Sequence, residues 1–183
     1  MNENFLGGRV VVKFGDITQE ETDAIVNAAN STLMGGGGVD GAIHEAAGEN
    51  LLFECKKIRQ SDYPNGLPTS GAVITAGGNL PANFVIHTVG PLYGSNKGKD
   101  AQMLCDSYFN CLKLAAENDI KTISFPSIST GAFAYPKEEA AQVSSQVIED
   151  FLDHDSIIAQ VFLVFYSQND ARIFLANQKF SRR

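Results

Sequence analysis

The sequence predicts an α/β layered fold built around a largely parallel, mixed sheet. Short runs rich in valine and isoleucine alternate along the chain with segments of helical period, an order typical of strands and helices packed in layers. Two loops of small residues each follow a predicted strand and precede a predicted helix. Because the chain has 183 residues, of which 44% are hydrophobic and 19% charged, we expect a single domain over residues 1–183 with its own core.

Apolar segments rich in β-branched residues are expected to form the strands. The last of these segments is the longest apolar run in the chain, which predicts a central strand covered on both faces. The predicted strands are residues 10–14, 24–28, 72–75, 84–89, 122–125 and 157–166.

Segments with apolar residues three and four positions apart are expected to form the helices. Pro136 suits the first turn of a helix, whereas Gly48 is expected to interrupt one. Residues 62–68, rich in proline, asparagine and glycine, predict a surface loop. The predicted helices are residues 40–59, 100–117, 136–152 and 170–179.

The charge balance narrows the classes of partner. A net charge of −7 and a pI near 4.9 argue against a general nucleic-acid binder, which needs a basic face. A small anionic ligand remains compatible, because backbone amides bind phosphate without lysine or arginine. The opening MNENFLGG lacks a basic region followed by an apolar run, and no run approaches the ~20 apolar residues of a membrane helix. We expect a cytoplasmic protein without membrane partners, and a monomer by default.

The cysteines and histidines do not predict a metal centre. Cys55, Cys105 and Cys111 are odd in number and have no C-x-x-C spacing, so reduced thiols are favoured over a disulfide or a zinc site. The three histidines are scattered along the chain without ligand spacing. We therefore expect no metal and no cofactor.

Residues 27–48, NAANSTLMGGGGVDGAIHEAAG, contain the most informative motif. The four consecutive glycines allow bare backbone amides to approach a ligand, and a predicted helix follows, whose N-terminus favours anions. Strand, glycine loop and helix together predict a phosphate-binding loop; the alternative is a flexible loop without a ligand. The motif lacks the Lys-Ser/Thr of a P-loop, and Gly36, Gly38 and Gly41 match G-x-G-x-x-G only loosely. The pair Asn27 and Asn30 is also foreign to a dinucleotide fingerprint.

A second loop, residues 127–133, lies in the same position between a predicted strand and a predicted helix. Its small hydroxyl residues and glycine again offer amide donors. Two such loops at the carboxyl ends of strands suit a diphosphate lying between them, in the crevice where open α/β sheets bind ligands. Phe133 either covers a sugar face or fills the core beside the helix.

Two further residues end predicted strands and suit a nucleobase. Asp16, in Gly-Asp-Ile-Thr, either accepts a hydrogen bond from an exocyclic amine such as that of adenine or caps a turn. Tyr166 ends the longest apolar run and either stacks on a base or is an edge aromatic.

Together these residues resemble the macrodomain family, which recognises ADP-ribose, and specifically its MacroD-type branch of ADP-ribosyl hydrolases. Asn30, followed after six residues by Gly37-Gly38-Val39-Asp40, and Gly131-Ala132-Phe133 later match the two-part signature of the branch. Ala134 departs from the family, which commonly has glycine there. The resemblance covers nearly the whole chain, through residues 15–18, 25–30, 35–48, 85–91 and 126–136.

The resemblance implies a three-layer α/β/α sandwich around a mixed six-stranded sheet. It implies that Asp16 and the amide of Ile17 bind adenine, that Tyr166 lies against the base, and that Phe133 lies near the distal ribose. Asn27 is expected among the ligand-binding residues. The expected diphosphate-binding residues are Gly37, Gly38, Val39, Ser129, Thr130, Gly131, Ala132 and Phe133.

The resemblance assigns catalysis to Asn30 and Asp40. Asn30 would hold a ribose hydroxyl, and Asp40 would orient or deprotonate a water between the α-phosphate and the sugar, a role the phosphate can share. His44, one turn beyond Asp40, either faces the same pocket or is structural. No metal and no covalent nucleophile are required, since the cysteines lie outside every motif.

Three functions compete. An enzyme would hydrolyse the ester between ADP-ribose and acidic side chains of mono-ADP-ribosylated proteins and would deacetylate O-acetyl-ADP-ribose. A reader would bind ADP-ribose without cleaving it. Both need Asp16 and the two loops, but only the enzyme needs Asn30 and Asp40 together, which favours the enzyme. An RNA-binding function is disfavoured by the acidic charge balance.

Overall fold

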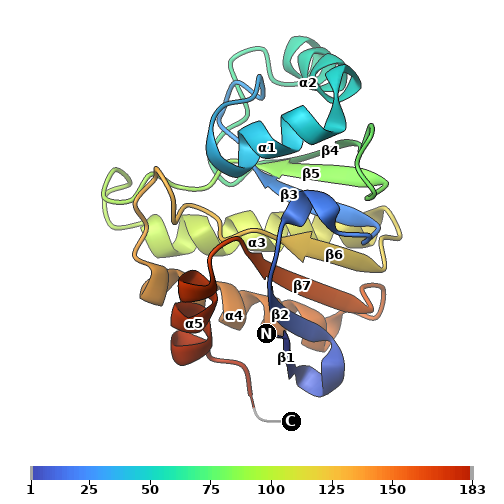
Figure 1. Ribbon diagram of the computed structural model, residues 1–183. Helices are drawn as coiled ribbons and strands as arrows, with labels where there is room; N and C mark the ends of the chain where they lie inside the picture. Colours follow the sequence, from blue (N-terminus) through green and yellow to red (C-terminus); the bar gives the residue numbers. More distant parts are fainter. Residues whose placement is uncertain (1, 182–183) are drawn as a thin grey trace.

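The computed structural model describes residues 2–181. The strands are β1 (Asn2–Phe5), β2 (Val10–Phe14), β3 (Ala24–Ala28), β4 (Ala72–Ala76), β5 (Phe84–Thr88), β6 (Thr122–Phe125) and β7 (Gln160–Phe165). They form one mixed sheet in the order β1-β2-β7-β6-β3-β5-β4 (Figure 1). The five central strands are parallel, whereas β1 and β4 pair antiparallel at the two edges.

The helices cover both faces of the sheet, so the expected α/β/α sandwich is confirmed. Side chains of α1 and α2 pack on one face, and side chains of α3, α4 and α5 pack on the other; Figure 1 shows α1 and α2 at the top of the view, apart from α4 and α5. The predicted break at Gly48 is present: this residue, at φ +82°, separates α1 from α2. The helices are α1 (Gly38–Ala47), α2 (Glu49–Ser61), α3 (Asp100–Glu117), α4 (Lys137–His154) and α5 (Gln168–Asn177), with short 3₁₀ turns at Leu6–Gly8 and Ile17–Gln19.

The described part of the chain has seven strands, one more than the six-stranded sheet that was expected. The additional strand is β1, which pairs with β2 so that Asn2 lies opposite Lys13 and Phe5 opposite Val10. Its first three residues are polar and exposed, so no apolar alternation indicated it. An edge strand needs only one backbone partner, and here β2 provides it.

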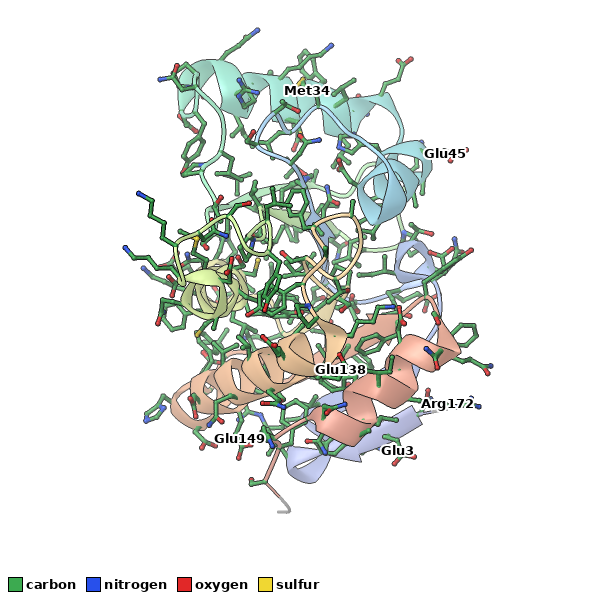
Figure 2. All side chains as sticks on the ribbon, turned by 90° about the vertical axis from the view of Figure 1, so that its left-hand side faces the viewer. Glu3, Met34, Glu45, Glu138, Glu149 and Arg172 are labelled. Atoms are coloured by element: carbon green, nitrogen blue, oxygen red, sulfur yellow. The ribbon has the colours of Figure 1, made fainter. Side chains whose placement is uncertain are left out.

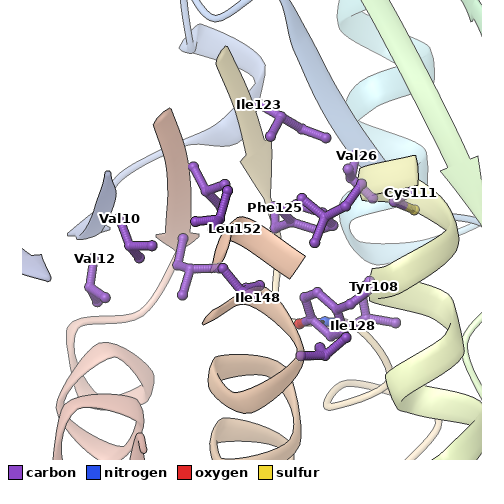
Figure 3. Close-up of a cluster of buried hydrophobic side chains, with 14 of the residues drawn as sticks. Val10, Val12, Val26, Tyr108, Cys111, Ile123, Phe125, Ile128, Ile148 and Leu152 are labelled. Carbon is purple, nitrogen blue, oxygen red and sulfur yellow. Dashed lines mark hydrogen bonds between the residues drawn. The ribbon is translucent and has the colours of Figure 1, made fainter. Parts of the chain in front are cut away.

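Alternate residues of the central strands build two cores, because successive side chains of a strand point to opposite faces. Ile25 and Val85 pack with Ile43 of α1 on one side. Figure 3 shows the other side, where Val26 and Phe125 from neighbouring strands meet helical side chains that include Tyr108 of α3 and Ile148 of α4. The sheet that positions the loops is therefore packed on both faces.

The loops after β3, β5 and β6 project from one end of the sheet, at the left of Figure 1. Figure 2 views the molecule from that side and shows the exposed Glu45 of α1 at the right edge and the exposed Glu138 of α4 in the middle of the view. Within residues 2–181, no helix combines the length and the apolar character needed to cross a membrane.

Candidate active site

A cavity of about 740 Å³ opens where the parallel strands end. Four chain segments supply most of its lining: the residues after β2, the loop from β3 into α1, the loop from β6 into α4, and the end of β7 with Tyr166. Gly90, after β5, and Asp170 of α5 complete it. A crevice at the carboxyl ends of parallel strands is the usual place for a ligand in an open α/β sheet.

Nearly all the predicted site residues line this one cavity. The exception is Asn27, which has no exposed surface and lies behind the wall. The expectation that Asn27 contacts the ligand is therefore corrected. The predicted residues that line the cavity are Asp16, Ile17, Asn30, Gly37, Gly38, Val39, Asp40, Ser129, Thr130, Gly131, Ala132, Phe133 and Tyr166.

The first glycine loop wraps tightly around the start of α1. A Cβ added at Gly36 would lie 3.2 Å from Asp40 Oδ2 and 3.3 Å from Asn30 Nδ2, and one at Gly41 would lie 2.5 Å from the carbonyl oxygen of Gly36. Side chains at these positions would push the loop away from the helix. The N-terminal turn of α1, which begins at Gly38, therefore stands at the cavity wall, where its free amides and dipole favour an anion.

Asp40 is a buried carboxylate, only 5% exposed, in the first turn of α1. Its Oδ1 accepts a hydrogen bond from Asn27 Nδ2 at 2.8 Å. No hydrogen bond within residues 2–181 occupies its Oδ2, which points toward Gly36 in the cavity wall. The helix N-terminus favours the negative charge. Asn27 thus fixes Oδ1 from the side away from the cavity, and Oδ2 can accept a hydrogen bond from a water or a ligand hydroxyl.

His44 lies beside Asp40 but outside the cavity lining. Its Nε2 is 3.4 Å from Asp40 Oδ1 and forms no hydrogen bond with a described residue, so the contact is electrostatic at most. Its ring packs under Gly35, whose added Cβ would lie 3.5 Å from the imidazole. The arrangement favours the structural interpretation of His44 over a direct ligand contact.

Asn30 lines the cavity and braces the glycine loop. Its Oδ1 accepts hydrogen bonds from the amide of Thr32 at 3.1 Å and the hydroxyl of Thr32 at 2.5 Å. Its Nδ2 donates to the carbonyl of Gly35 at 3.0 Å. One amide hydrogen of Asn30 remains for a ligand, because a primary amide carries two.

The second loop takes left-handed backbone conformations at two non-glycine residues. Ser129 has φ +66° and Ala134 has φ +57°. The latter explains why glycine suits position 134, since alanine adopts this conformation at a cost. The hydroxyl of Ser129 is buried without a partner among the described residues. It lies so close to Gly90 that a side chain there would collide with it.

Phe133 is half-buried and lines the cavity, so it does not fill the core. The carbonyl of Phe133 accepts a hydrogen bond from the amide of Tyr93 at 3.0 Å, which ties the second loop to the chain after β5. The ring is thus a wall of the cavity at the side of the second loop.

Asp16 and Tyr166 border another part of the cavity. Asp16 is exposed, and its Oδ1 accepts from the amide of Thr18 at 2.9 Å and from the hydroxyl of Thr18 at 2.7 Å. It therefore caps the turn at Ile17–Gln19 and lines the cavity as well, so the two interpretations of Asp16 are compatible. Tyr166 is 84% exposed beside it in the lining.

The sequence-based predictions missed some cavity residues and one buried neighbour. Gly15, Ala28, Gly90, Val164, Phe165 and Asp170 also line the cavity. His87 lies behind Asn27, 3.1 Å from its amide nitrogen. A polar residue in an apolar strand was the available signal for His87, as it was for Asn27. Burial and the nearby His44 lower the pKa of His87 to about 3, so the ring is neutral at physiological pH.

Comparison with known proteins places this geometry in a family. The model of the Macro domain matches residues 26–144. The O-acetyl-ADP-ribose deacetylase of Citrobacter koseri is 49% identical over 166 residues, covering 91% of this chain and 93% of its own. The solved structure of the Oceanobacillus iheyensis macrodomain with ADP has 42% identity and a TM-score of 0.91, covering 97% of this chain and 93% of its own.

A Trypanosoma brucei macrodomain in complex with ADP-ribose has 34% identity and a TM-score of 0.83, covering 91% of this chain and 68% of its own. The likeness therefore extends over almost all of the present chain, including the strands and loops that form the cavity. The chain belongs to the macrodomain family.

Proposed function

We propose that this protein is an ADP-ribosyl-ester hydrolase of the MacroD type. It removes ADP-ribose from acidic side chains of mono-ADP-ribosylated proteins and deacetylates O-acetyl-ADP-ribose. The observation that carries the proposal is Asp40: a buried carboxylate at a helix N-terminus in the cavity lining, with one oxygen fixed by Asn27 and the other directed at Gly36 in the cavity wall. The naming of the Citrobacter koseri relative as a deacetylase and the ADP-ribose bound to the Trypanosoma brucei neighbour support it.

The cavity offers a matching group for each part of ADP-ribose. The exposed oxygen of Asp16 and the amide of Ile17 bind the adenine amine and ring, with Tyr166 against the base. The start of α1 and the loop of residues 129–133 hold the diphosphate between them, because both present backbone amides at the same cavity. Phe133 then lies near the distal ribose, and Asn30 donates its remaining amide hydrogen to a ribose hydroxyl.

Hydrolysis consumes one water and releases ADP-ribose and a carboxylic acid. Asp40 Oδ2 orients this water and accepts its proton, alone or together with an oxygen of the substrate phosphate. The carboxylate that leaves is acetate for the free metabolite and a glutamate or aspartate side chain for a modified protein. Because both substrates are esters at the same ribose, one site serves both. We further propose that residues 1–183 act as one monomeric macrodomain.

The test is release of ADP-ribose from a glutamate-linked mono-ADP-ribosylated protein under single-turnover conditions, comparing the wild type with Asp40→Ala. Rapid release by the wild type, with little by the variant, supports the hydrolase and its carboxylate. A wild type that binds ADP-ribose tightly and releases none is a reader, and the proposed activity is then wrong.

A further inference from the structure

A chain of buried polar side chains runs from Asp40 into the sheet, away from the cavity. Asn27 Nδ2 lies 2.8 Å from Asp40 Oδ1 and 3.1 Å from His87 Nδ1. On the far side of the imidazole, His87 Nε2 lies 3.0 Å from Thr75 Oγ1 and 3.9 Å from Cys55 Sγ. Asn27 and His87 are 0% exposed and Thr75 is 3% exposed, so water does not compete for these contacts.

The strand register brings the members of this chain together. Asn27 and His87 are direct partners in the parallel pair of β3 and β5, so their side chains leave the sheet on the same face. Thr75 follows on β4, the antiparallel neighbour of β5. Three adjacent strands thus contribute one side chain each, and α1 contributes Asp40.

The direction of each hydrogen bond follows from donor chemistry. An amide nitrogen only donates, so His87 Nδ1, facing Asn27 Nδ2, must accept, and the ring proton must be on Nε2. Thr75 Oγ1 is placed to accept that proton. The reverse orientation of the Asn27 amide would turn its oxygen onto the carboxylate of Asp40, which repels it. The Nε2-protonated tautomer of His87 and this orientation of the Asn27 amide therefore require each other.

We propose that Thr75, His87 and Asn27 are positioning residues for Asp40: Thr75 holds the Nε2-protonated tautomer of His87, this tautomer orients the Asn27 amide, and the amide fixes Oδ1 of Asp40 so that Oδ2 faces the cavity. The catalytic part of this inference rests on the proposed hydrolase. The low pKa of His87, about 3, agrees with a ring that stays neutral, because a protonated ring would place an N–H against the amide of Asn27.

The first test measures the tautomer of His87 and the orientation of Asp40 in the absence of substrate. ¹⁵N NMR of the ligand-free protein, labelled at histidine and assigned with His44→Gln and His154→Gln, should show His87 protonated on Nε2. A crystal structure of Asn27→Leu, which removes the amide at similar side-chain volume, should show Asp40 Oδ1 without its partner and the carboxyl group rotated. A ring proton on Nδ1, or an Asp40 that keeps its orientation in Asn27→Leu, overturns the inference.

The second test separates positioning from folding. Thr75→Val removes the acceptor for His87 and should lower single-turnover hydrolysis about tenfold, the scale of one lost hydrogen bond, with the ADP-ribose Kd nearly unchanged. Thr75→Ser restores the hydroxyl and should recover most of the rate. Thr22→Val is the matched control. The buried hydroxyl of Thr22 bonds to Ala24 and Ser124 and makes no hydrogen bond with Thr75, His87 or Asn27, so turnover of this variant should stay at the wild-type level.

Full turnover of Thr75→Val, or an equal loss in Thr22→Val, overturns the inference. The outcomes also separate the two proposals. A wild type that hydrolyses neither ester but has the Nε2 tautomer, together with a rotated Asp40 in Asn27→Leu, contradicts the proposed function and supports the positioning. An active wild type with the other tautomer contradicts the positioning alone.

Discussion

Two carboxylates line the cavity, and the protein holds them in different ways. Asp16 is exposed, and among the described residues its carboxylate is bonded only to Thr18, two residues further along the chain. Asp40 is buried and bonded to Asn27, which is itself held by His87 from a neighbouring strand. In the proposed function Asp16 only binds the ligand, and a local cap suffices for that because small adjustments cost little affinity. The proposed role of Asp40 in the reaction needs fixed geometry, which the packed sheet provides.

The largest expected effect is the loss of turnover on removing the buried carboxylate. Asp40→Ala should lower the single-turnover rate by roughly 10²–10⁴, the usual contribution of a positioned acid–base group. ADP-ribose affinity measured by calorimetry should stay within a few-fold of wild type. Unchanged turnover would remove Asp40 from the mechanism, and the contrast between the two carboxylates would lose its functional meaning.

Asp16→Ala should have the opposite profile. We expect ADP-ribose binding to weaken by about 1.5–3 kcal/mol, the scale of a hydrogen bond to a charged group. Turnover of bound substrate should change much less. Undiminished affinity in calorimetry would show that Asp16 only caps its turn and that the adenine lies elsewhere.

The buried support of Asp40 should also make the fold sensitive to acid. The folded-state pKa of His87, about 3, lies below the unfolded value near 6.5, so the unfolded chain binds the additional proton and stability falls as pH drops below about 6.5. Between pH 7 and pH 5, protonation of His87 in the unfolded chain should lower the free energy of unfolding by about 2 kcal/mol. Urea unfolding of wild type and His87→Gln at both pH values measures it; equal pH slopes in the two proteins would contradict it.

The smallest effect should come from Asn30, which braces the glycine loop and also faces the cavity. Asn30→Ala should lower turnover about tenfold, as expected for one hydrogen bond, and leave affinity within a few-fold. Gly35 loses its side-chain brace in this variant. If only the Kd rises, Asn30 positions the ribose without assisting the reaction.

Local patterns predicted most of the fold. The strands at residues 10–14 and 24–28 and the helix at residues 100–117 were predicted with the bounds observed, because they carry a clear period and apolar side chains. Strand β7 begins at Gln160 rather than Ile157. Asp155 Oδ2 accepts hydrogen bonds from the amides of Ile157 and Ile158 and folds them into a turn. Apolar content alone does not show such a cap.

The loops of the site could be predicted because glycine and small residues cluster in the sequence, but the support of Asp40 could not. Asn27 lies next to the glycine loop in the chain and was expected to bind the ligand. Its side chain instead points to His87, sixty positions away. Only the pairing of β3 with β5 brings the two residues together, and strand pairing of this kind is a property of the tertiary fold rather than of a local pattern.

The strand order predicts which backbone amides exchange their hydrogens slowly and which exchange them fast. β3 lies inside the sheet between β6 and β5, so the amides around Asn27 can open only when much of the sheet opens, and their exchange should report global unfolding. The turn at Ile17–Gln19 can open by itself, and its amides should exchange through a local fluctuation. A ligand that contacts only Asp16 would thus protect the turn first, whereas one that bridges both loops would slow exchange across the whole cavity.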